Sequence, residues 1–450
     1  MSVLSRRGAL RAGLLGGAAS AALGASTADT AAASAAAVEA AATTVFDVTA
    51  YGAVGDGSTD DTAAIQAALD AAAAVPGSAV SFPPAAGGCY RVSGLTVSGR
   101  ISRLSGESAL YAANGPGSVT VKGSVLAPLD AATPGLLTIG ASGAGSVVAA
   151  NPHGLCVAGL GFLGTTPAGT AIPGFWAATV TDTSDVTFLE CRDLYCGAYA
   201  FPGFPAGGDG SGGFAAFLSS GTGNAFSVNG RVLFCNSYGA GTFVLADGLS
   251  AAYPGGGSTD GRVVCCQVNG HGYGVVLGLA HAGAGGWAIL ETHFSSQPGL
   301  CHIDYGTTGN AWTLRVEGCY LDVCGDVHIA CAGRGLQAVG NYFRGLANTC
   351  AIRFGAALAV KGRDPAAQLV ANTYDLNGNT AATEFARFAG MTAAAFALHG
   401  GGEYRGNLVH NHGAALPTGW IGPFTGSDAV AVANTVSATL ELAQGPVLSG

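Results

Sequence analysis

The chain has 450 residues, of which 74 are glycine, while only 10% carry a charged side chain. So many small residues and so few charges are unusual in a compact enzyme and suit a solenoid of short strands and tight turns. The formal net charge of −9 excludes general affinity for nucleic acid, because an acidic surface cannot replace the counterions of the phosphates.

Residues 1–28 have the features of an export signal. Arg6 and Arg7 precede a weakly apolar run from 12 to 25, as in twin-arginine signals; an ordinary secretory signal is the alternative. Residues 29–44 are rich in Ala, Ser and Thr and are expected to form a low-complexity linker. No later apolar run is long enough to cross a membrane. We therefore expect a bacterial protein that is exported to the periplasm or the extracellular space.

Residues 45–100 are predicted to form an N-terminal cap module with the first strands. A short strand leads through a glycine turn into a helix that ends before Pro76 and Gly77. One face of this helix is apolar and carries Ala64, Ile65, Ala68, Leu69 and Ala72. The densest carboxylates of the chain, Asp56, Asp60 and Asp61, lie at its start. We therefore interpret them as turn and N-cap residues and not as catalytic groups.

Two strings in this module resemble a known family. They are YGAVGDGSTDDTAAIQAALDAA, from 51 to 72, and SAVSFPPAAGGCYRVSG, from 78 to 94. Both are similar to the N-terminal module of the pectate-lyase-like superfamily, which includes glycoside hydrolase family 28-related and rhamnogalacturonase/epimerase-like proteins. The resemblance implies an all-β fold, a right-handed single-stranded parallel β-helix with the α-helix as its N-terminal cap. It does not define the reaction, because this fold carries hydrolases, lyases, epimerases and non-catalytic binding proteins.

From about 101 to 380, short strands and turns recur, mostly at intervals of about 23–31 residues, which is the signature of a parallel β-solenoid. A leucine-rich repeat has a similar length, but its regular leucine ladder is absent from the sequence. We align the repeats on Glu190, Cys235, Cys266, Glu291, Glu317, Gly340 and Ala371. Asn341 and Asn372 are interpreted as stacked turn asparagines. Residues 381–450 are expected to form the last coils and a C-terminal cap.

Twelve cysteines in an exported protein would normally indicate disulfides. Most of those here lie inside apolar strand patterns, so we predict free, buried core residues instead. No C-x-x-C pair and no His/Cys cluster has the spacing of a zinc site, so no metal centre is predicted.

Glu291 and Glu317 are the predicted catalytic residues. Strand alternation places both outward, together with Arg315. Because their segments align in the repeat, the two carboxylates should lie on adjacent coils, roughly 5 Å apart. Two carboxylates at so short a distance have divergent pKa values, which provides an acid and a base. The expected separation also fits a retaining glycosidase. Arg315 is predicted to contact substrate; the alternative is a solvated Glu/Arg ladder on a surface sheet.

A second strand of the repeat supplies the other predicted substrate contacts. In LCHIDYG, alternation places His302 and Asp304 outward. In the same register His328 should lie beside His302, and Arg353 should fall in the column of Asp304. Such a surface is suited to binding a glycan or to acid–base chemistry. The alternative is an ordinary polar outer face.

Asn269-Gly270-His271-Gly272 resembles the Gly-His-Gly element of polygalacturonases. The remaining elements of that family differ, since no paired Asp-Asp precedes it and no Arg-Ile-Lys follows it. Polygalacturonase activity itself is therefore not predicted. An Asp cluster like that of calcium-dependent pectate lyases is also not evident.

These patterns predict an exported carbohydrate-active protein, a glycoside hydrolase or a polysaccharide lyase. The alternative is a non-catalytic extracellular β-helix that binds glycans or adheres. A polysaccharide is the expected partner, and nucleic acid is not. No cofactor is predicted, although a lyase would be compatible with Ca²⁺. The sequence is compatible with a monomer or a homotrimer.

Overall fold

The computed structural model describes residues 43–112, 119–141, 151–198, 211–220, 227–248, 257–278, 284–295, 301–306, 311–345, 350–354, 367–376, 384–388, 402–411, 429–432, 435–438 and 443–444. The predicted export signal, and all but the last two residues of the predicted linker, lie outside this part of the chain. Among the described residues, no helix is long and apolar enough to span a membrane.

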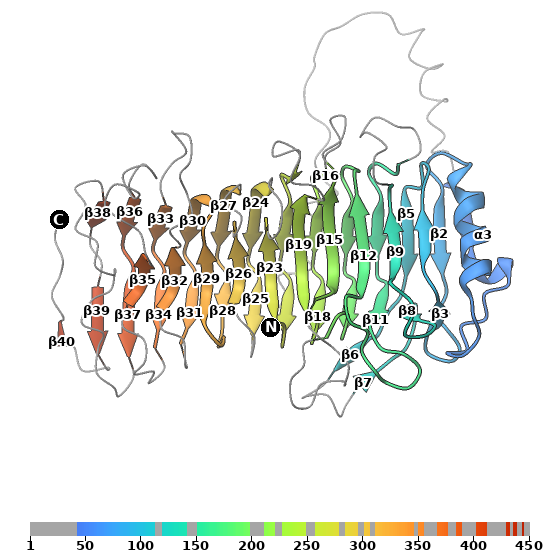
Figure 1. Cartoon of the computed structure of the whole chain (residues 1–450), viewed down its shortest axis with the longest axis horizontal. Coiled ribbons are helices and arrows are strands. Elements are labelled where there is room, and N and C mark those ends of the chain that lie inside the picture. Colours follow the sequence, from blue (N-terminus) through green and yellow to red (C-terminus); the bar gives the residue numbers. More distant parts are fainter. Residues whose placement is uncertain are drawn as a thin grey trace, which may run out of the picture. The chain divides into compact units, whose positions relative to one another are not determined.

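The first described elements form the predicted cap. Strand β1 (Val45–Asp47) and the 3-10 helix η1 (Val48–Tyr51) lead to helix α3 (Thr62–Ala73). The predicted apolar face of α3 is buried except for Ala64, which is half-buried. This face packs against β1, η1, β2 (Ala79–Phe82) and β4 (Leu95–Val97). Figure 1 shows α3 beside β2 at the N-terminal end of the strands, where it covers the first coil.

All three aspartates of the cap bind backbone N–H groups, but only Asp56 and Asp60 do so in the way interpreted from the sequence. Asp56 and Asp60 accept hydrogen bonds from N–H groups two or three residues further along the chain. Asp61 precedes α3, but its buried carboxylate accepts from Val54 and Gly55 at 2.6 and 3.1 Å instead of capping the helix. All three carboxylates therefore shape the turn that positions α3.

Replacing Ala68 by aspartate is expected to lower the free energy of unfolding by about 3–5 kcal/mol, because an unpaired carboxylate would be buried. Ala68 is fully buried, whereas its neighbour Ala67 is exposed on the same helix. Ala67→Asp is the matched control, with an expected change within about 0.5 kcal/mol. Urea denaturation measures both variants. Equal losses would contradict the role of α3 as a cap over the first coil.

Three parallel sheets, here called A, B and C, follow the cap. Sheet A contains, in spatial order, β1, β2, β5 (Arg103–Gly106), β10 (Cys156–Ala158), β13 (Thr187–Leu189), β17 (Arg231–Leu233), β21 (Arg262–Val264), β24 (Ala284–Leu290), β27 (Trp312–Glu317), β30 (Arg334–Val339), β33 (Ala367–Val370), β36 (Gly402–Arg405) and β38 (Ala429–Val432). Two short strands, β16 (Ser227–Val228) and β20 (Ser258–Thr259), join it at β24.

Sheets B and C repeat this order. Sheet B contains β3 (Tyr90–Val92), β8 (Val125–Pro128), β11 (Gly161–Leu163), β14 (Arg192–Leu194), β18 (Asn236–Tyr238), β22 (Gln267–Asn269), β25 (His293–Ser295), β28 (Tyr320–Leu321), β31 (Tyr342–Arg344), β34 (Thr373–Asp375), β37 (Leu408–Asn411), β39 (Thr435–Ala438) and the antiparallel β40 (Ala443–Gln444). Sheet C contains β4, β9 (Gly135–Ile139), β12 (Trp176–Thr181), β15 (Gly213–Ser219), β19 (Thr242–Gly248), β23 (Tyr273–Leu277), β26 (Cys301–Tyr305), β29 (Val327–Cys331), β32 (Cys350–Phe354) and β35 (Glu384–Phe388). A separate antiparallel pair is formed by β6 (Tyr111–Ala112) and β7 (Val119–Thr120).

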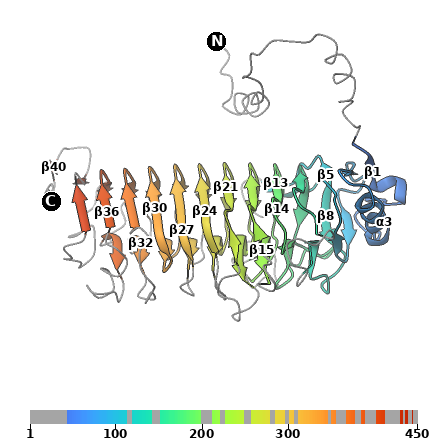
Figure 2. The same ribbon diagram turned by 90° about the horizontal axis from the view of Figure 1, so that it is seen from above.

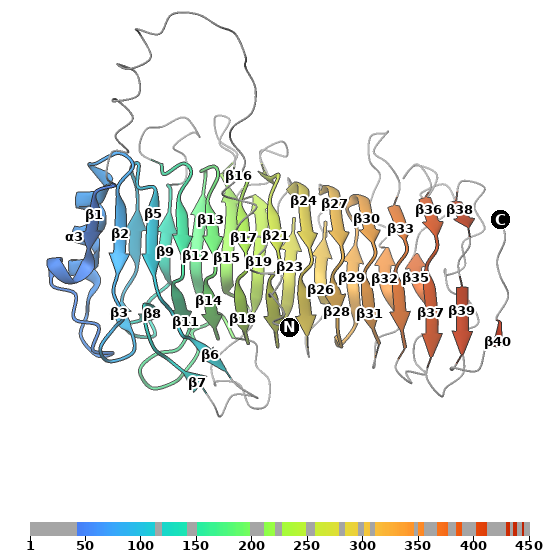
Figure 3. The ribbon, with the colours of Figure 1, turned by 180° about the vertical axis from the view of Figure 1, so that it is seen from behind.

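Most of the described coils contribute one strand to each sheet, so residues far apart in sequence lie side by side. Figure 2 shows the strands succeeding one another in chain order from the cap onward, and Figure 3 shows the row of β24, β27 and β30 above the row of β28 and β31. Buried aliphatic and aromatic side chains from all three sheets form one continuous core. The predicted right-handed single-stranded parallel β-helix with an N-terminal capping helix is confirmed.

The turn from sheet A to sheet B places one residue per coil in the left-handed conformation. These residues are Gly159, Glu190, Phe234, Cys265, Glu291, Gly318, Gly340, Ala371 and Gly406. The alignment predicted from the sequence is therefore one residue late at Cys235 and Cys266 and one residue early at Glu317. The turn accepts acidic, aromatic and small residues alike, so no residue type marks its position in the sequence.

The residue that follows each left-handed position is buried, and in most coils its side chain donates to a carbonyl of the preceding coil. The thiols of Cys191, Cys235, Cys266 and Cys319 do so at 3.4–3.5 Å. The amides of Asn341, Asn372 and Asn407 do so at 2.7–2.9 Å. The stacked asparagines are thus confirmed. All twelve cysteines are free; ten are buried, as predicted for core residues, whereas Cys156 and Cys265 are half-buried.

Candidate functional site

The predicted catalytic pair lies at the turn between sheets A and B, but its side chains are not in one column. Glu291 occupies the left-handed turn position, and its N–H donates to the carbonyl of Glu317 at 2.9 Å. Glu317 aligns with Leu290, and its carboxylate pairs with Arg315 on its own strand. The two glutamates do lie on adjacent coils, but the predicted shared register is wrong by one residue.

The prediction that His302 and His328 face outward is wrong. The two residues do lie side by side, with ring centroids 5.2 Å apart, but both are fully buried. The first three residues of β26 are all buried, so inward–outward alternation begins only further along the strand. His302 packs on Phe294 and His328 on Phe343, both in the core. Neither histidine is therefore placed to contact a polysaccharide from outside.

Asp304 and Arg353 lie in one column of sheet C, as predicted, with Ala330 between them. Arg353 pairs with Asp326 at 2.7 Å. Both Arg353 and Asp326 are about one-third exposed, so this pair is accessible to a ligand on the outer face of sheet C. Asp304 and Arg353 are thus two coils apart in that column.

A denser group of chemically useful side chains points outward from sheet B; five of its six members are half-buried, and the sixth, Asp375, is buried. Its first row is aromatic: His293 and Tyr320 have ring centroids 4.7 Å apart, and Tyr320 and Tyr342 are 5.2 Å apart. Its second row is charged. We call the two rows together the sheet B polar face, and its members are His293, Tyr320, Asp322, Tyr342, Arg344 and Asp375. The register of β25, β28, β31 and β34 brings them together from four successive coils.

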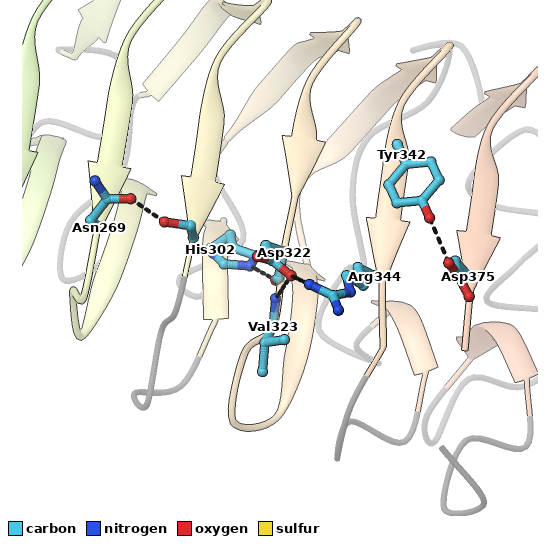
Figure 4. Close-up of polar contacts among 8 residues, drawn as sticks. Asn269, His302, Asp322, Val323, Tyr342, Arg344 and Asp375 are labelled. Carbon is cyan, nitrogen blue, oxygen red and sulfur yellow. Dashed lines mark hydrogen bonds and ion pairs between the residues drawn. The ribbon is translucent and has the colours of Figure 1, made fainter. Parts of the chain in front are cut away.

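The charged row alternates in sign along the coils. Arg344 Nη1 lies 3.3 Å from Asp322 Oδ1, and Arg344 is the register partner of Asp375. The Tyr342 hydroxyl donates to Asp375 Oδ2 at 2.6 Å. Figure 4 shows these contacts on one face, with Asp322 and Asp375 on either side of Arg344. Because the carboxylates are two coils apart, their backbones are separated by roughly 9–10 Å.

Burial shifts the pKa values of His293 and Tyr342 in the aromatic row. It lowers the pKa of His293, partly opposed by Asp322, so the imidazole is neutral near pH 7. The Nε2 atom of His293 is buried and has no hydrogen-bond partner within the described residues. Burial, followed by the hydrogen bond to Asp375, raises the pKa of Tyr342 well above its ordinary value. The face thus offers carboxylates, a guanidinium, the neutral imidazole of His293 and the protonated phenol of Tyr342.

Sequence reasoning did not single out the sheet B polar face, although a signal for it exists. In NYFR, from 341 to 344, the buried ladder residue is followed by residues that face alternately out and in. Counting from Asn341 and Asn372 therefore places Tyr342, Arg344 and Asp375 together. The alignment on Glu317 shifts that count by one residue and conceals the row.

A second polar cluster is enclosed in the core. Ser237 hydrogen-bonds to the Asp193 carboxyl and, at 2.8 Å, to His271 Nε2. All three residues are buried. The resemblance of residues 269–272 to a polygalacturonase element therefore does not correspond to a surface site here. Because serine lies between the acid and the histidine, the order also differs from a nucleophile–base–acid arrangement.

Replacing Asp193 by asparagine is expected to remove a pH dependence of stability. Burial raises the pKa of Asp193 from 3.8 to about 7, so the folded chain holds a proton that the unfolded chain loses. This contribution to stability is complete below the unfolded pKa and is lost as pH rises through the folded pKa. The thermal midpoint of the variant relative to wild type should therefore increase from about pH 4 to about pH 8.

His271 gives stability an opposite dependence on pH, which cancels when the variant is compared with wild type. Burial lowers the pKa of His271 to about 3, so its contribution is present above pH 6.5 and is lost as pH falls toward 3. This trend is common to both proteins. A midpoint difference that does not change with pH would contradict a protonated Asp193.

The N-terminal module is similar to a known protein family. Residues 45–124 match the family described as "Rhamnogalacturonase A/epimerase, pectate lyase-like". No curated protein sequence matches the chain. The match begins at β1 and includes the cap and the first strands of all three sheets.

Solved structures with the same fold cover most of the chain. The A-module of the mannuronan C-5 epimerase AlgE6 from Azotobacter vinelandii has a TM-score of 0.58 at 14% identity, over 90% of this chain and 97% of that one. PfbA, a surface adhesin of Streptococcus pneumoniae, has a TM-score of 0.55 at 15% identity, over 88% and 94%. DFA-IIIase from Arthrobacter chlorophenolicus without its lid has a TM-score of 0.50 at 12% identity, over 88% and 98%. These structural similarities demonstrate the fold, and the family match over residues 45–124 agrees with the resemblance predicted for the N-terminal module.

Proposed function

Given an N-terminal module and a fold of the pectate-lyase-like superfamily, we propose that this chain is an exported protein that binds a polysaccharide along the sheet B polar face and cleaves its glycosidic bonds. The observation that carries the proposal is the double row of aromatic and charged side chains across four successive coils. A rigid β-helix repeats its coils at roughly 4.8 Å, so an extended glycan along the axis meets the same kind of contact at each step.

The aromatic row is the proposed binding platform. The neighbouring rings are tilted against one another, and ring edges of this kind suit apolar contacts and hydrogen bonds with sugar rings. His293, Tyr320 and Tyr342 are all half-buried, so their positions are held while one edge of each remains accessible. Such pre-organisation lowers the entropic cost of binding.

The charged row is the proposed source of the chemistry. In a hydrolase, Asp322 and Asp375 would act as the acid and base, since carboxylates more widely spaced than in a retaining enzyme leave room for a water molecule. In a lyase, the neutral His293 would remove a proton while Arg344 neutralises charge on the substrate. Ca²⁺ would be an additional source of positive charge in that case.

The catalytic pair predicted from the sequence, Glu291 and Glu317, is a competing proposal for the same reaction. Glu291 lies in the A–B turn itself, and Arg315 and Glu317 lie on β27 before that turn, where they pair with each other. We prefer the sheet B polar face because its groups come from four coils and include neutral and charged partners. Asp304 and Arg353 remain proposed outer contacts on sheet C.

A non-catalytic function is the second candidate. It is supported by the likeness to the adhesin PfbA and by the low proportion of charged residues. In that case the aromatic row would bind a glycan without turnover. A monomer and a homotrimer are both compatible with either function.

A polysaccharide panel tests the proposal. Each glycan is incubated with the protein, with Ca²⁺ or with a chelator, and two signals are followed: new reducing ends and the ultraviolet absorbance of unsaturated uronides. Reducing ends alone indicate a hydrolase, and both signals indicate a lyase. Affinity electrophoresis on the same glycans detects binding without cleavage, which would favour the second candidate. If the protein neither binds nor cleaves any glycan of the panel, both candidate functions are contradicted.

A further inference from the structure

Three potential metal ligands meet inside the β-helix, beneath the sheet B polar face. His302 comes from β26, His328 from β29, and Cys324 from the segment between β28 and β29. All three residues are fully or almost fully buried. Each has one potential donor atom, and these three atoms lie within 4.8 Å of one another. The sequence spacing did not reveal this group because two adjacent coils contribute to it.

His302 is already oriented as a ligand would be. Its Nε2 atom lies 2.5 Å from the main-chain carbonyl of Asp322, so Nε2 carries the proton and donates it (Figure 4). The lone pair is then on Nδ1, which is buried and has no hydrogen-bond partner within the described residues. A metal-binding histidine usually donates its second ring nitrogen to a carbonyl or carboxylate in this way.

Cys324 and His328 complete the group. Cys324 Sγ lies 3.6 Å from His328 Nδ1, which is close to the separation of two donors bound to one ion. Metal bonds of about 2.3 Å to sulfur and 2.0 Å to nitrogen place donors roughly 3.3–3.8 Å apart. The three donor atoms lie within 4.8 Å of one another, which exceeds that range by about 1 Å at most, so small side-chain rotations close the group.

We propose that His302, Cys324 and His328 form a buried site for one thiophilic d¹⁰ cation, Cu⁺ in preference to Zn²⁺. Two imidazoles and one thiolate are ligands that both ions accept. Binding forms a metal–sulfur bond as the Cys324 thiol releases its proton to solvent. The thiolate then neutralises Cu⁺ completely, whereas Zn²⁺ leaves one uncompensated positive charge in the core. A buried net charge is costly, and this difference favours Cu⁺.

Because the group is enclosed, the ion would enter during folding or through local opening of the coils. Metal binding of this kind contributes to folding stability, since the unfolded chain has no preformed site. Retained metal should therefore resist a chelator that removes surface-bound ions.

Metal content of the full chain tests the proposal. The protein is expressed with added Zn²⁺ or with copper kept reduced by ascorbate, treated with a chelator, and assayed by mass spectrometry of its metals. We expect about one copper per wild-type chain and at least ten-fold less in Cys324→Ser and His328→Gln. Cys331→Ser is the matched control, since this buried thiol lies on β29 outside the group, and it should retain the metal.

Three results would overturn parts of this proposal. Less than about one-tenth of an equivalent of either metal in folded wild type would exclude the site. Equal loss in Cys331→Ser would exclude its assignment to Cys324, and zinc retention without copper would overturn the preference for Cu⁺. If the Cys324 variant does not fold, the thermal midpoint of wild type with and without metal decides: a rise supports the site, and an unchanged midpoint excludes it.

Discussion

Asp375→Asn is expected to lower turnover of a confirmed polysaccharide substrate by about 10²–10⁴-fold, because a general acid or base commonly contributes that factor. The asparagine keeps the size of the side chain and an acceptor for the Tyr342 hydroxyl, so folding should be preserved. Asp322→Asn is expected to have a loss in the same range. Initial rates at saturating substrate measure turnover, and affinity electrophoresis shows whether binding persists.

Controls separate this assignment from the competing one. Asp185→Asn alters an exposed ion pair with Arg231 on sheet A and should leave turnover unchanged. Glu317→Gln distinguishes the two proposals: full activity favours the sheet B polar face, whereas a loss as large as that of Asp375→Asn favours the glutamate pair. Unchanged turnover in both Asp322→Asn and Asp375→Asn would remove the sheet B carboxylates from the reaction.

Asn372→Ala is expected to lower the free energy of unfolding by about 3–5 kcal/mol, because several buried hydrogen bonds are lost and their partners remain enclosed. The Asn372 amide donates to Ala338 O at 2.8 Å and to Asn407 Oδ1 at 2.9 Å. Its own oxygen accepts from the N–H and the side chain of Asn341 at 3.1 and 3.0 Å. Urea denaturation followed by circular dichroism measures the loss.

The matched control for the ladder is Asn236→Ala, at a half-buried position on the outer face of sheet B. Its expected change is within about 0.5 kcal/mol, since alanine there leaves no enclosed polar group. A loss of unfolding free energy below about 1 kcal/mol for Asn372→Ala would contradict this expectation. It would show that water can replace the hydrogen bonds of the stacked amides at little cost in stability.

The cap and the fold were accessible from the sequence because their signals are local. The apolar spacing of Ile65, Ala68 and Leu69 follows from the geometry of one helix, and the burial of those residues confirms it. The aspartates before the helix bind nearby N–H groups, an interaction that residue type and position alone indicate. Short strands recurring at coil length could close only as a solenoid.

The candidate site was not accessible in this way, because it depends on register across coils. An error of one residue in locating the turn beside Glu317 assigns the following side chains to the wrong face of the sheet. The turn position cannot be recognised from its residue type, because residues as different as Phe234 and Gly340 occupy it. Alternation also fails at the start of β26, where consecutive residues are buried and His302 faces the core.

Local periodicity therefore specifies the cap, the strands and the cysteines and asparagines of the core, since each depends on neighbours along the chain. The meeting of Asp322, Arg344 and Asp375, and that of His302 with Cys324 and His328, depends on which residues of successive coils become neighbours. That choice is made by the stacking of whole coils, where loop lengths and core packing set the register. Only the folded chain brings those side chains within reach of one another.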